Sequence, residues 1–262
     1  MQKNITTRLE DIEKKHNIKI LYACESGSRA WGFESPDSDY DIRFIYVNRL
    51  DYYLSIEKKR DVIELREGEL DFVGWDLRKS LFLLRKSNPS LIEWLNSPIV
   101  YLKDEDFYKK IKKLMEKSFN PKSLMYHYLH MTKSNYREYL RGDLVKIKKY
   151  FYVLRPISAL KYIEEKKEIP PIEFEKLINL VSISQNIKAE ILKLLEEKKK
   201  SKELELKPKI EILNRFIEEN LEYYENFLKK WKIKVSYPES FEFDFLLKEM
   251  IFRYEPQVCN ST

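Results

Sequence analysis

Cysteine is scarce in this sequence, since Cys24 and Cys259 are the only two in 262 residues. Two cysteines so far apart do not indicate a disulfide framework or a zinc site. Long apolar runs are also missing: no stretch of about 18 consecutive apolar residues predicts a transmembrane helix. The first residues, Met1 to Asn4, lack the apolar core of a signal peptide. We therefore expect a soluble cytoplasmic protein with no membrane partner.

Aromatic residues are plentiful, with 18 Tyr and 14 Phe, and they accompany a high charge content. Disordered chains are poor in aromatic residues, so this composition argues for a folded protein. The length suits one large domain or two small ones, with enough apolar residues for a real core.

The net charge of +6 is unevenly distributed. The segment 121–155 holds two acidic residues, Glu138 and Asp143, and eight basic ones: Lys122, Lys133, Arg137, Arg141, Lys146, Lys148, Lys149 and Arg155. A local positive field attracts polyanions such as triphosphates or nucleic acid. The alternative is a solvated helix face.

The first part of the chain alternates between strand and helix signals. Apolar periodicity and turn residues predict helices over 5–16, up to Trp31, over 76–87 and over 90–95. The predicted strands are 18–23, 39–47, 61–67, 70–75 and 99–102, and Gly68 closes a hairpin between the third and the fourth.

After Asn120-Pro121 helical periodicity dominates. The predicted helices are 122–140, 147–165, 172–180, 187–199, 210–231 and 241–252, and Pro156 is expected to divide the second of them. The run from Lys198 to Lys202 reads as a solvated helix end, to which we assign no site. We therefore predict an α+β fold with a mixed-sheet domain over 1–120 and an all-α domain over 121–262.

Two short motifs carry the chemistry. Gly27-Ser28 predicts a tight turn into a short helix, where exposed amides and the Ser28 hydroxyl bind phosphate. Asp39 and Asp41 alternate on one face of the following strand, so both carboxylates point the same way. Tyr40, Ile42, Phe44 and Tyr46 form the apolar opposite face, which holds the strand against a core.

Two carboxylates directed at one spot repel each other unless cations lie between them. Mg²⁺ prefers such oxygen ligands together with substrate phosphates. Two ions about 3.5–4 Å apart can activate a hydroxyl and neutralise leaving pyrophosphate. Asp71, at the start of a strand beside a hairpin turn, is the best candidate for a third carboxylate. Glu64 and Glu69 are weaker candidates because their neighbourhoods are charged.

Some of these residues have other possible interpretations. An isolated Asp-x-Asp is most often a surface or turn motif. A calcium loop starting at Asp37 is excluded, because Ile42 and Asn48 stand where Gly and Glu are required. His127 and His130, three residues apart, indicate packing or polar contact rather than a metal site. Arg29 either steers a phosphate or pairs with a nearby acid.

The segment from Gly27 to Arg43, together with Asp71, resembles the signature of the DNA polymerase β nucleotidyltransferase superfamily. Its pattern is Gly-Ser-Arg-Ala-Trp-Gly-Phe-x-Ser-x-x-Ser-Asp-Tyr-Asp-x-Arg. It is most similar to the branch linked with RNA-repair loci and called RlaP. The segment Trp75 to Leu77 and the segment Lys149 to Pro156 also look like that family. The resemblance covers most of residues 20–165.

This resemblance implies a catalytic domain with a mixed sheet, a helical domain, and a nucleotide in the cleft between them. It implies two Mg²⁺ ions, with Mn²⁺ as an alternative, held by Asp39, Asp41 and Asp71, and a nucleoside triphosphate as donor. Gly27, Ser28 and Arg29 are the expected nucleotide-binding residues of the first domain. By position, those of the second are Lys148, Lys149, Tyr152 and Arg155. A further stripe that could follow an RNA backbone consists of His130, Lys133, Arg137 and Arg141.

The leading hypothesis is a template-independent nucleotidyltransferase that acts on RNA 3′ ends, such as those of cleaved tRNA. A protein-adenylylating or small-molecule nucleotidyltransferase is the alternative, and a non-catalytic nucleotide-binding module is a third. The sequence leaves the acceptor, the preferred base, the number of nucleotides added, the oligomeric state and the role of residues 170–262 undetermined.

Overall fold

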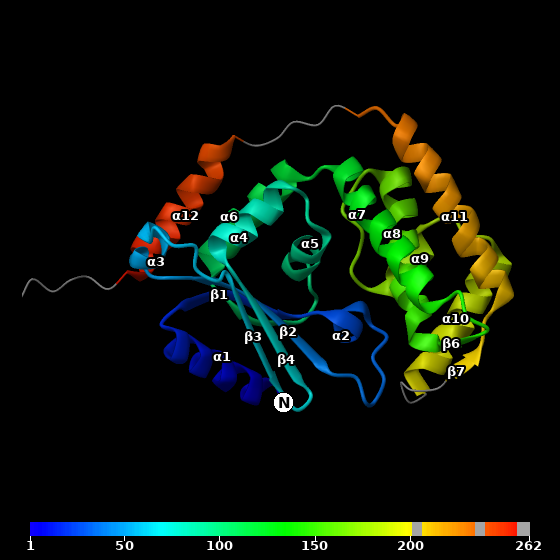
Figure 1. Cartoon of the computed structure of the whole chain (residues 1–262), viewed down its shortest axis with the longest axis horizontal. Helices are drawn as coiled ribbons and strands as arrows, with labels where there is room; N and C mark the ends of the chain where they lie inside the picture. The colour runs from blue at the N-terminus through cyan, green and yellow to red at the C-terminus, as the bar shows by residue number, and fades with distance from the viewer. Residues whose placement is uncertain (201–205, 234–238, 256–262) are drawn as a thin grey trace, which may run out of the picture.

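The computed structural model describes residues 1–200, 206–233 and 239–255. A mixed sheet with covering helices forms one side of the molecule, and a group of long helices forms the other (Figure 1). The fold class is therefore α+β, as the sequence predicted.

The sheet has five strands: β1 (Lys19–Glu25), β2 (Tyr40–Val47), β3 (Val62–Glu67), β4 (Leu70–Asp76) and β5 (Val100–Lys103). Their order is β3-β4-β2-β1-β5. β2 and β4 run parallel, and the other neighbouring pairs are antiparallel. The parallel pairing aligns the starts of β2 and β4 at one edge of the sheet, which brings Asp41 opposite Asp71.

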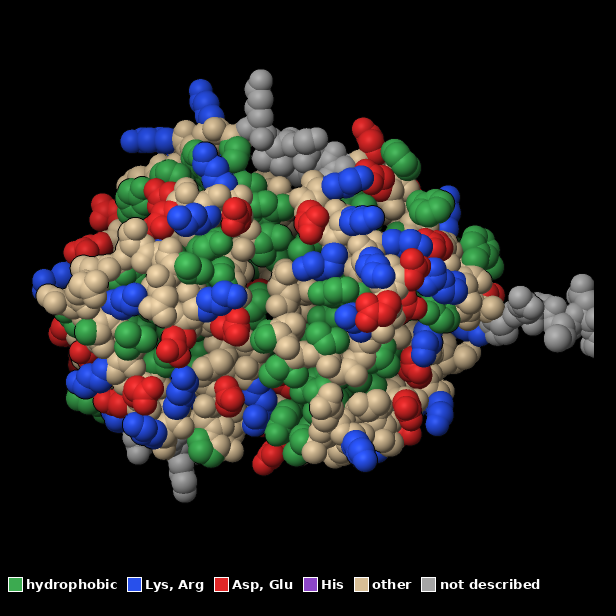
Figure 2. Space-filling model, turned by 180° about the vertical axis from the view of Figure 1, so that it is seen from behind, with side chains coloured by type: hydrophobic (Ala, Val, Ile, Leu, Met, Phe, Trp, Pro, Cys, Tyr) green, Lys and Arg blue, Asp and Glu red, His purple; other side chains and the backbone are tan. Residues whose placement is uncertain are grey.

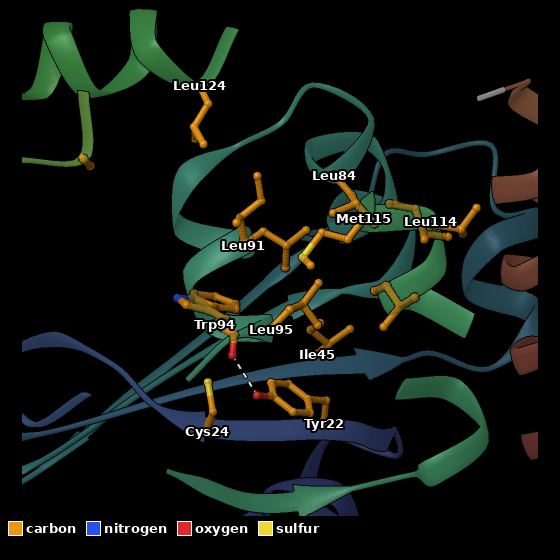
Figure 3. Close-up of a cluster of buried hydrophobic side chains, with 14 of the residues drawn as sticks. Tyr22, Cys24, Ile45, Leu84, Leu91, Trp94, Leu95, Leu114, Met115 and Leu124 are labelled. Atoms are coloured by element: carbon orange, nitrogen blue, oxygen red, sulfur yellow. Dashed lines mark hydrogen bonds between the residues drawn. The ribbon is translucent and has the colours of Figure 1, made fainter. Parts of the chain in front are cut away.

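Helices cover both faces of the sheet. α1 (Gln2–His16) packs Ile5, Leu9 and Ile12 against one face. The other face is covered by α4 (Leu77–Arg85), α5 (Pro89–Leu95) and α6 (Glu105–Ser118). Figure 3 shows this second core, in which side chains of all three helices converge on Tyr22, Cys24 and Ile45 of the central strands. Because β1 and β2 are buried on both faces, the edge that carries the candidate carboxylates is rigidly supported.

The described residues form eight further helices: α2 (Gly27–Trp31), α3 (Leu50–Leu54), α7 (Pro121–Tyr139), α8 (Ile147–Lys166), α9 (Phe174–Leu180), α10 (Gln185–Lys200), α11 (Glu211–Lys230) and α12 (Ser240–Tyr254). A small two-stranded sheet pairs β6 (Leu144–Lys146) with β7 (Leu206–Pro208). α3, α6, β6 and β7 were not predicted from the sequence.

The expected division of the helix at Pro156 is wrong, because α8 runs continuously through that residue. An interior proline costs about 3 kcal/mol or more through a lost hydrogen bond and a steric clash. Here the residues on both sides, from Val153 to Leu160, are all buried. Packing on several sides of the helix outweighs that cost.

The interpretation of Lys198 to Lys202 as a solvated end also needs correction. Lys198 is 2% exposed and lies against the loop that follows α2. Ser201 and Lys202 lie outside the described residues, as does Cys259. Cys24 is buried in the core shown in Figure 3.

The last helix returns to the sheet side of the molecule. α12 lies beside α4 and α6 (Figure 1). Its residues Phe243, Leu246 and Met250 belong to the same core as side chains of those two helices. The domain boundary at Asn120-Pro121 stays a prediction. Among the described residues, none of the helices combines the length and apolarity that crossing a bilayer requires.

Candidate active site

The turn at Gly27 lies directly against the strand that carries Asp41. The backbone N–H of Ser26 donates to the carbonyl of Asp41 over 2.8 Å. Gly27 has a φ of 60°, and a β-carbon at this position would stand 2.1 Å from Oδ2 of Asp41. Glycine is therefore required both by backbone conformation and by space. The half-buried Ser28 follows at once in α2. The two sequence motifs thus form one site.

Arg43 joins two of the three predicted carboxylates. Its Nη2 donates to Oδ1 of Asp41 over 2.6 Å and to Oδ2 of Asp71 over 2.8 Å. Its Nη1 donates to the carbonyls of Ile42 and Asp71. Residues two apart on a strand share a face, so the sequence signal for Arg43 was the same alternation that paired Asp39 with Asp41. A single guanidinium nitrogen therefore lies between the carboxylates of Asp41 and Asp71.

Asp39 has a different partner. Its Oδ2 accepts a hydrogen bond from Nη2 of Arg66 over 3.0 Å, and both side chains are exposed, at 46% and 68%. Among residues 1–200, 206–233 and 239–255, no three His, Cys, Asp or Glu side chains are grouped to hold a metal ion. The separate arginine partners of Asp39 and of the Asp41–Asp71 pair explain this arrangement.

The chemistry of the three carboxylates nevertheless suits Mg²⁺, because only oxygen donors are present. Burial raises the pKa of Asp41, and the charges of Asp71 and Asp39 raise it further, while Arg43 acts in the opposite direction. Asp71 and Asp39 therefore both repel the charged form of Asp41. A divalent cation would relieve that repulsion, provided that the guanidinium of Arg43 withdraws.

Glu25 is a fourth carboxylate of this site, and the sequence reasoning missed it. It ends β1, is fully buried, and accepts a hydrogen bond from the backbone N–H of Asp41 over 2.7 Å. The hydroxyl of Tyr101 on β5 donates to its other oxygen. Burial raises the pKa of Glu25. A signal was present, since this acid ends an apolar strand two residues before Gly27.

Arg29 is held by the loop after α2. Its guanidinium donates to the carbonyls of Ser38 and Asp39 over 2.8 and 3.2 Å, and it lies 3.7 Å from the centre of the Tyr40 ring. These contacts fix the chain just before β2. These partners are carbonyl oxygens and a ring rather than an acid, and phosphate steering by Arg29 stays a prediction.

One of the predicted residues of α8, Tyr152, contacts α2, and Lys149 lies next to that tyrosine. The ring of Tyr152 meets that of Trp31 edge-on, with centroids 5.6 Å apart. Nζ of Lys149 lies 5.2 Å from the centre of the Tyr152 ring and 3.6 Å from that of Tyr139. Lys148, the preceding residue, is half-buried. Tyr152 therefore lies at the end of α2, the short helix that begins at the predicted phosphate turn.

Arg155 is placed differently, inside the protein. It is 2% exposed, and its Nη1 donates to Oε1 of Glu93 over 2.7 Å. Glu93 also accepts hydrogen bonds from the Tyr128 hydroxyl and from the Trp31 indole over 2.9 and 3.3 Å. This burial argues against the predicted contact of Arg155 with a triphosphate. The guanidinium instead helps to join α2, α5, α7 and α8.

The predicted RNA-binding stripe on α7 faces acidic residues of α11. Lys133 pairs with Glu225, and the hydroxyl of Tyr136 donates to Glu218. A cavity of about 280 Å³ is lined by Lys133, Arg137 and Arg141 from α7 and its end, and by Glu218, Glu222 and Glu225 from α11. His130 and His127 are exposed. Figure 2 likewise shows basic and acidic side chains interspersed over the rear face.

Comparison with known proteins identifies the family of the chain. The model of the family described as "RlaP: RNA repair pathway DNA polymerase beta family" matches residues 1–246. A Bacillus subtilis (strain 168) protein, described as "Uncharacterized protein YcgL", is 48% identical over 223 residues, which are 85% of this chain and 86% of that protein. A nucleotidyltransferase-like protein from Exiguobacterium sibiricum 255-15 matches 95% of this chain and 80% of its own at 12% identity. Its TM-score of 0.32 is too low to argue from.

Proposed function

Because the chain belongs to the RlaP family, the RNA repair pathway DNA polymerase beta family, we propose that it transfers a nucleoside monophosphate from a nucleoside triphosphate to a hydroxyl acceptor, an RNA 3′ end. The observation that carries the proposal is the contact of the Gly27 turn with Asp41, which itself lies opposite Asp71 on the parallel strand β4. A phosphate-binding turn and a pair of carboxylates at one sheet edge suit nucleotidyl transfer.

In the proposed reaction, the acceptor oxygen forms a bond to the α-phosphorus of the donor. The bond between that phosphorus and the oxygen of the β-phosphate breaks, and pyrophosphate leaves with the electron pair. The proton of the acceptor hydroxyl passes to the carboxylate of Asp71. Mg²⁺ bound by Asp39, Asp41 and Asp71 would supply charge neutralisation at the phosphates and acidify the hydroxyl.

The residues of this chain have separate tasks in the proposal. Gly27 and Ser28 hold the triphosphate against the sheet edge, because their backbone lies beside Asp41. Lys149 and Tyr152 approach from α8, where a cation and an aromatic ring suit phosphate and base. Glu25 holds the backbone of Asp41 and so fixes the direction of that carboxylate.

A protein hydroxyl or a small molecule is the second candidate acceptor, and one observation favours it. The basic stripe of α7 is partly neutralised by α11, since Lys133 pairs with Glu225 and the cavity beside it contains two further glutamates. An RNA backbone would have to compete with these carboxylates for the same cations.

The test is incubation with each α-³²P-labelled nucleoside triphosphate and Mg²⁺, in the presence of RNA with a free 3′ hydroxyl or of cell lysate. We expect label on RNA ends, and a loss of about a hundredfold or more in Asp41→Ala and Asp71→Ala. Glu64→Ala, an exposed acid on β3 that pairs with Arg60, is the matched control and should keep its activity. Label in a protein band would move the assignment to protein adenylylation, and no label in any fraction would contradict transfer.

A further inference from the structure

The loop between α2 and β2 is unusually well fixed for a surface connection. Ser35 and Ser38 are 2% and 4% exposed. The N–H of Ser35 donates to Oγ of Ser38 and the N–H of Ser38 donates to the carbonyl of Ser35, each over 3.0 Å, and the two hydroxyl oxygens also lie 3.0 Å apart. These reciprocal hydrogen bonds close a turn immediately before Asp39.

A lysine from a distant part of the sequence completes this turn. Nζ of Lys198, near the end of α10, donates to Oγ of Ser35 over 2.8 Å across a separation of 163 residues. Figure 1 shows the loop after α2 extending from the sheet side toward the end of α10. The contact therefore connects the helical side of the molecule to the loop that leads into the site.

Burial of the Lys198 ammonium group removes it from water, which is costly unless polar partners compensate, so fully buried lysines are rare. Its neighbours on α10 behave in the ordinary way: Lys199 pairs with Glu175 over 3.5 Å and Lys200 pairs with Glu196 over 3.4 Å, at side-chain exposures of 35% and 77%. Lys198 alone of these three contacts Ser35 in the described part of the chain.

The position of the Ser35–Ser38 turn determines the position of Asp39, because the backbone connects them directly. Arg29 of α2 donates to the carbonyls of Ser38 and Asp39, and β2 begins at the next residue, Tyr40. The direction of the Asp39 carboxylate therefore depends on where Ser38 is held. Ser38 in turn depends on Ser35, the residue that Lys198 contacts.

From this geometry we propose that Lys198 is a positioning residue. It fixes the Ser35–Ser38 turn, and through that turn it fixes Asp39 for metal and nucleotide binding. The functional half of this inference rests on the proposed nucleotidyl transfer, whereas the positional half does not. α10 thus contributes to the site although none of its residues was predicted to belong to it.

Hydrogen exchange of the full-length protein tests the positional half. In Lys198→Met, the amides of Ser35 and Ser38 should exchange about tenfold faster or more than in the wild type, because their turn has lost its outer anchor. Lys199→Met removes the same charge from the adjacent, partly exposed position, and its rates for these two amides should stay within about twofold. Equal rates in the two variants would overturn the proposal. Ser35→Ala, which removes only the acceptor hydroxyl, provides a second route if Lys198→Met does not fold.

Steady-state kinetics test the functional half. Misplacement of Asp39 should lower kcat about tenfold or more in Lys198→Met and in Ser35→Ala, with little change in KM for the nucleotide. The double variant should lose less than the sum of the two single losses, because both substitutions remove the contact between Lys198 and Ser35. Additive losses, or a change confined to KM, would contradict positioning. If exchange responds as expected but the wild type transfers no nucleotide, the positional claim holds and the proposed function fails.

Discussion

Gly27 and Asp41 are in such close contact that a β-carbon on the glycine would stand 2.1 Å from Oδ2 of the aspartate. The contact joins the first residue of α2 to the second residue of β2, and the backbone hydrogen bond from Ser26 to Asp41 holds the two segments together at this point. The acid and the turn are therefore held at a fixed separation before any ligand arrives.

This contact makes Gly27→Ala a sharp test of the site. The added methyl group collides with a carboxylate that Arg43 and the sheet prevent from moving, so activity should fall about a hundredfold or more. Gly68→Ala is the matched control: its φ of 58° is almost the same as the 60° of Gly27, but nothing lies within 4 Å of the added carbon. The control should lose only about 1 kcal/mol of unfolding free energy and keep its activity. Equal losses of activity in both variants would assign the effect to backbone strain.

Arg43→Met should change the affinity of the nucleotide-free protein for Mn²⁺. The substitution removes the positive charge that lies between Asp41 and Asp71, so we expect Mn²⁺ to bind about tenfold tighter or more, as measured by electron paramagnetic resonance. Arg8→Met removes one charge from α1, where Arg8 pairs with Glu67, and it should leave the affinity unchanged. Weaker binding in Arg43→Met would mean that the guanidinium is needed to hold the carboxylates in place.

Arg155→Met should destabilise the protein strongly. It leaves Glu93 as a buried carboxylate with only the Tyr128 and Trp31 hydrogen bonds, so about 3–5 kcal/mol of unfolding free energy should be lost in urea denaturation. The double variant Glu93→Gln/Arg155→Met should recover part of this loss, because the unpaired charge is gone. A stable Arg155→Met protein that no longer binds nucleotide would instead support the original prediction that Arg155 contacts the triphosphate.

The stability of the protein should depend on the charge of Glu25. Burial raises the pKa of this residue above 4.5, so the folded state holds the proton more tightly than the unfolded chain does. Unfolding free energy should therefore rise as the pH falls through the pKa of the folded state, and this gain should be complete below the pKa of the unfolded chain.

Glu25→Gln should remove that dependence while keeping an acceptor for the Asp41 N–H. Thermal unfolding between neutral and acidic pH measures the difference, with Glu69→Gln in the exposed β3–β4 turn as control. If the stability of the wild type and of Glu25→Gln changed with pH in the same way, the predicted role of Glu25 would be contradicted.

Local patterns in the sequence predicted the sheet and the carboxylate edge. Alternation predicted that Asp39 and Asp41 share one face of a strand, but β2 begins at Tyr40, and Asp39 pairs with Arg66 whereas Asp41 pairs with Arg43. The Gly68 turn correctly predicted the pairing of β3 with β4. The parallel register that sets Asp41 opposite Asp71 depends on the whole sheet, so no local pattern could reveal it. α6 was missed even though Asp104 caps its first turn by accepting from the N–H of Phe107.

The errors concern side chains whose partners lie far away in the sequence. Arg155 was assigned to a basic helix face, but it pairs in the protein interior with Glu93, which lies 62 positions earlier in the sequence. Lys198 stands in a lysine run that is typical of a solvated end, and Ser35 lies 163 positions before it. Periodicity predicts which face of a helix a residue lies on, but it does not predict which residues of other elements pack against that face.

The return of α12 to the sheet side has a consequence for biosynthesis. Arg49 and the N–H of Leu50 both bond the carboxylate of Glu255, and Phe243, Leu246 and Met250 complete the core over α4 and α6. While the ribosome is still making residues 121–239, the first-made part lacks this cover and its apolar surface stays open to water. The nascent chain should therefore recruit chaperones until residue 255 has left the exit tunnel.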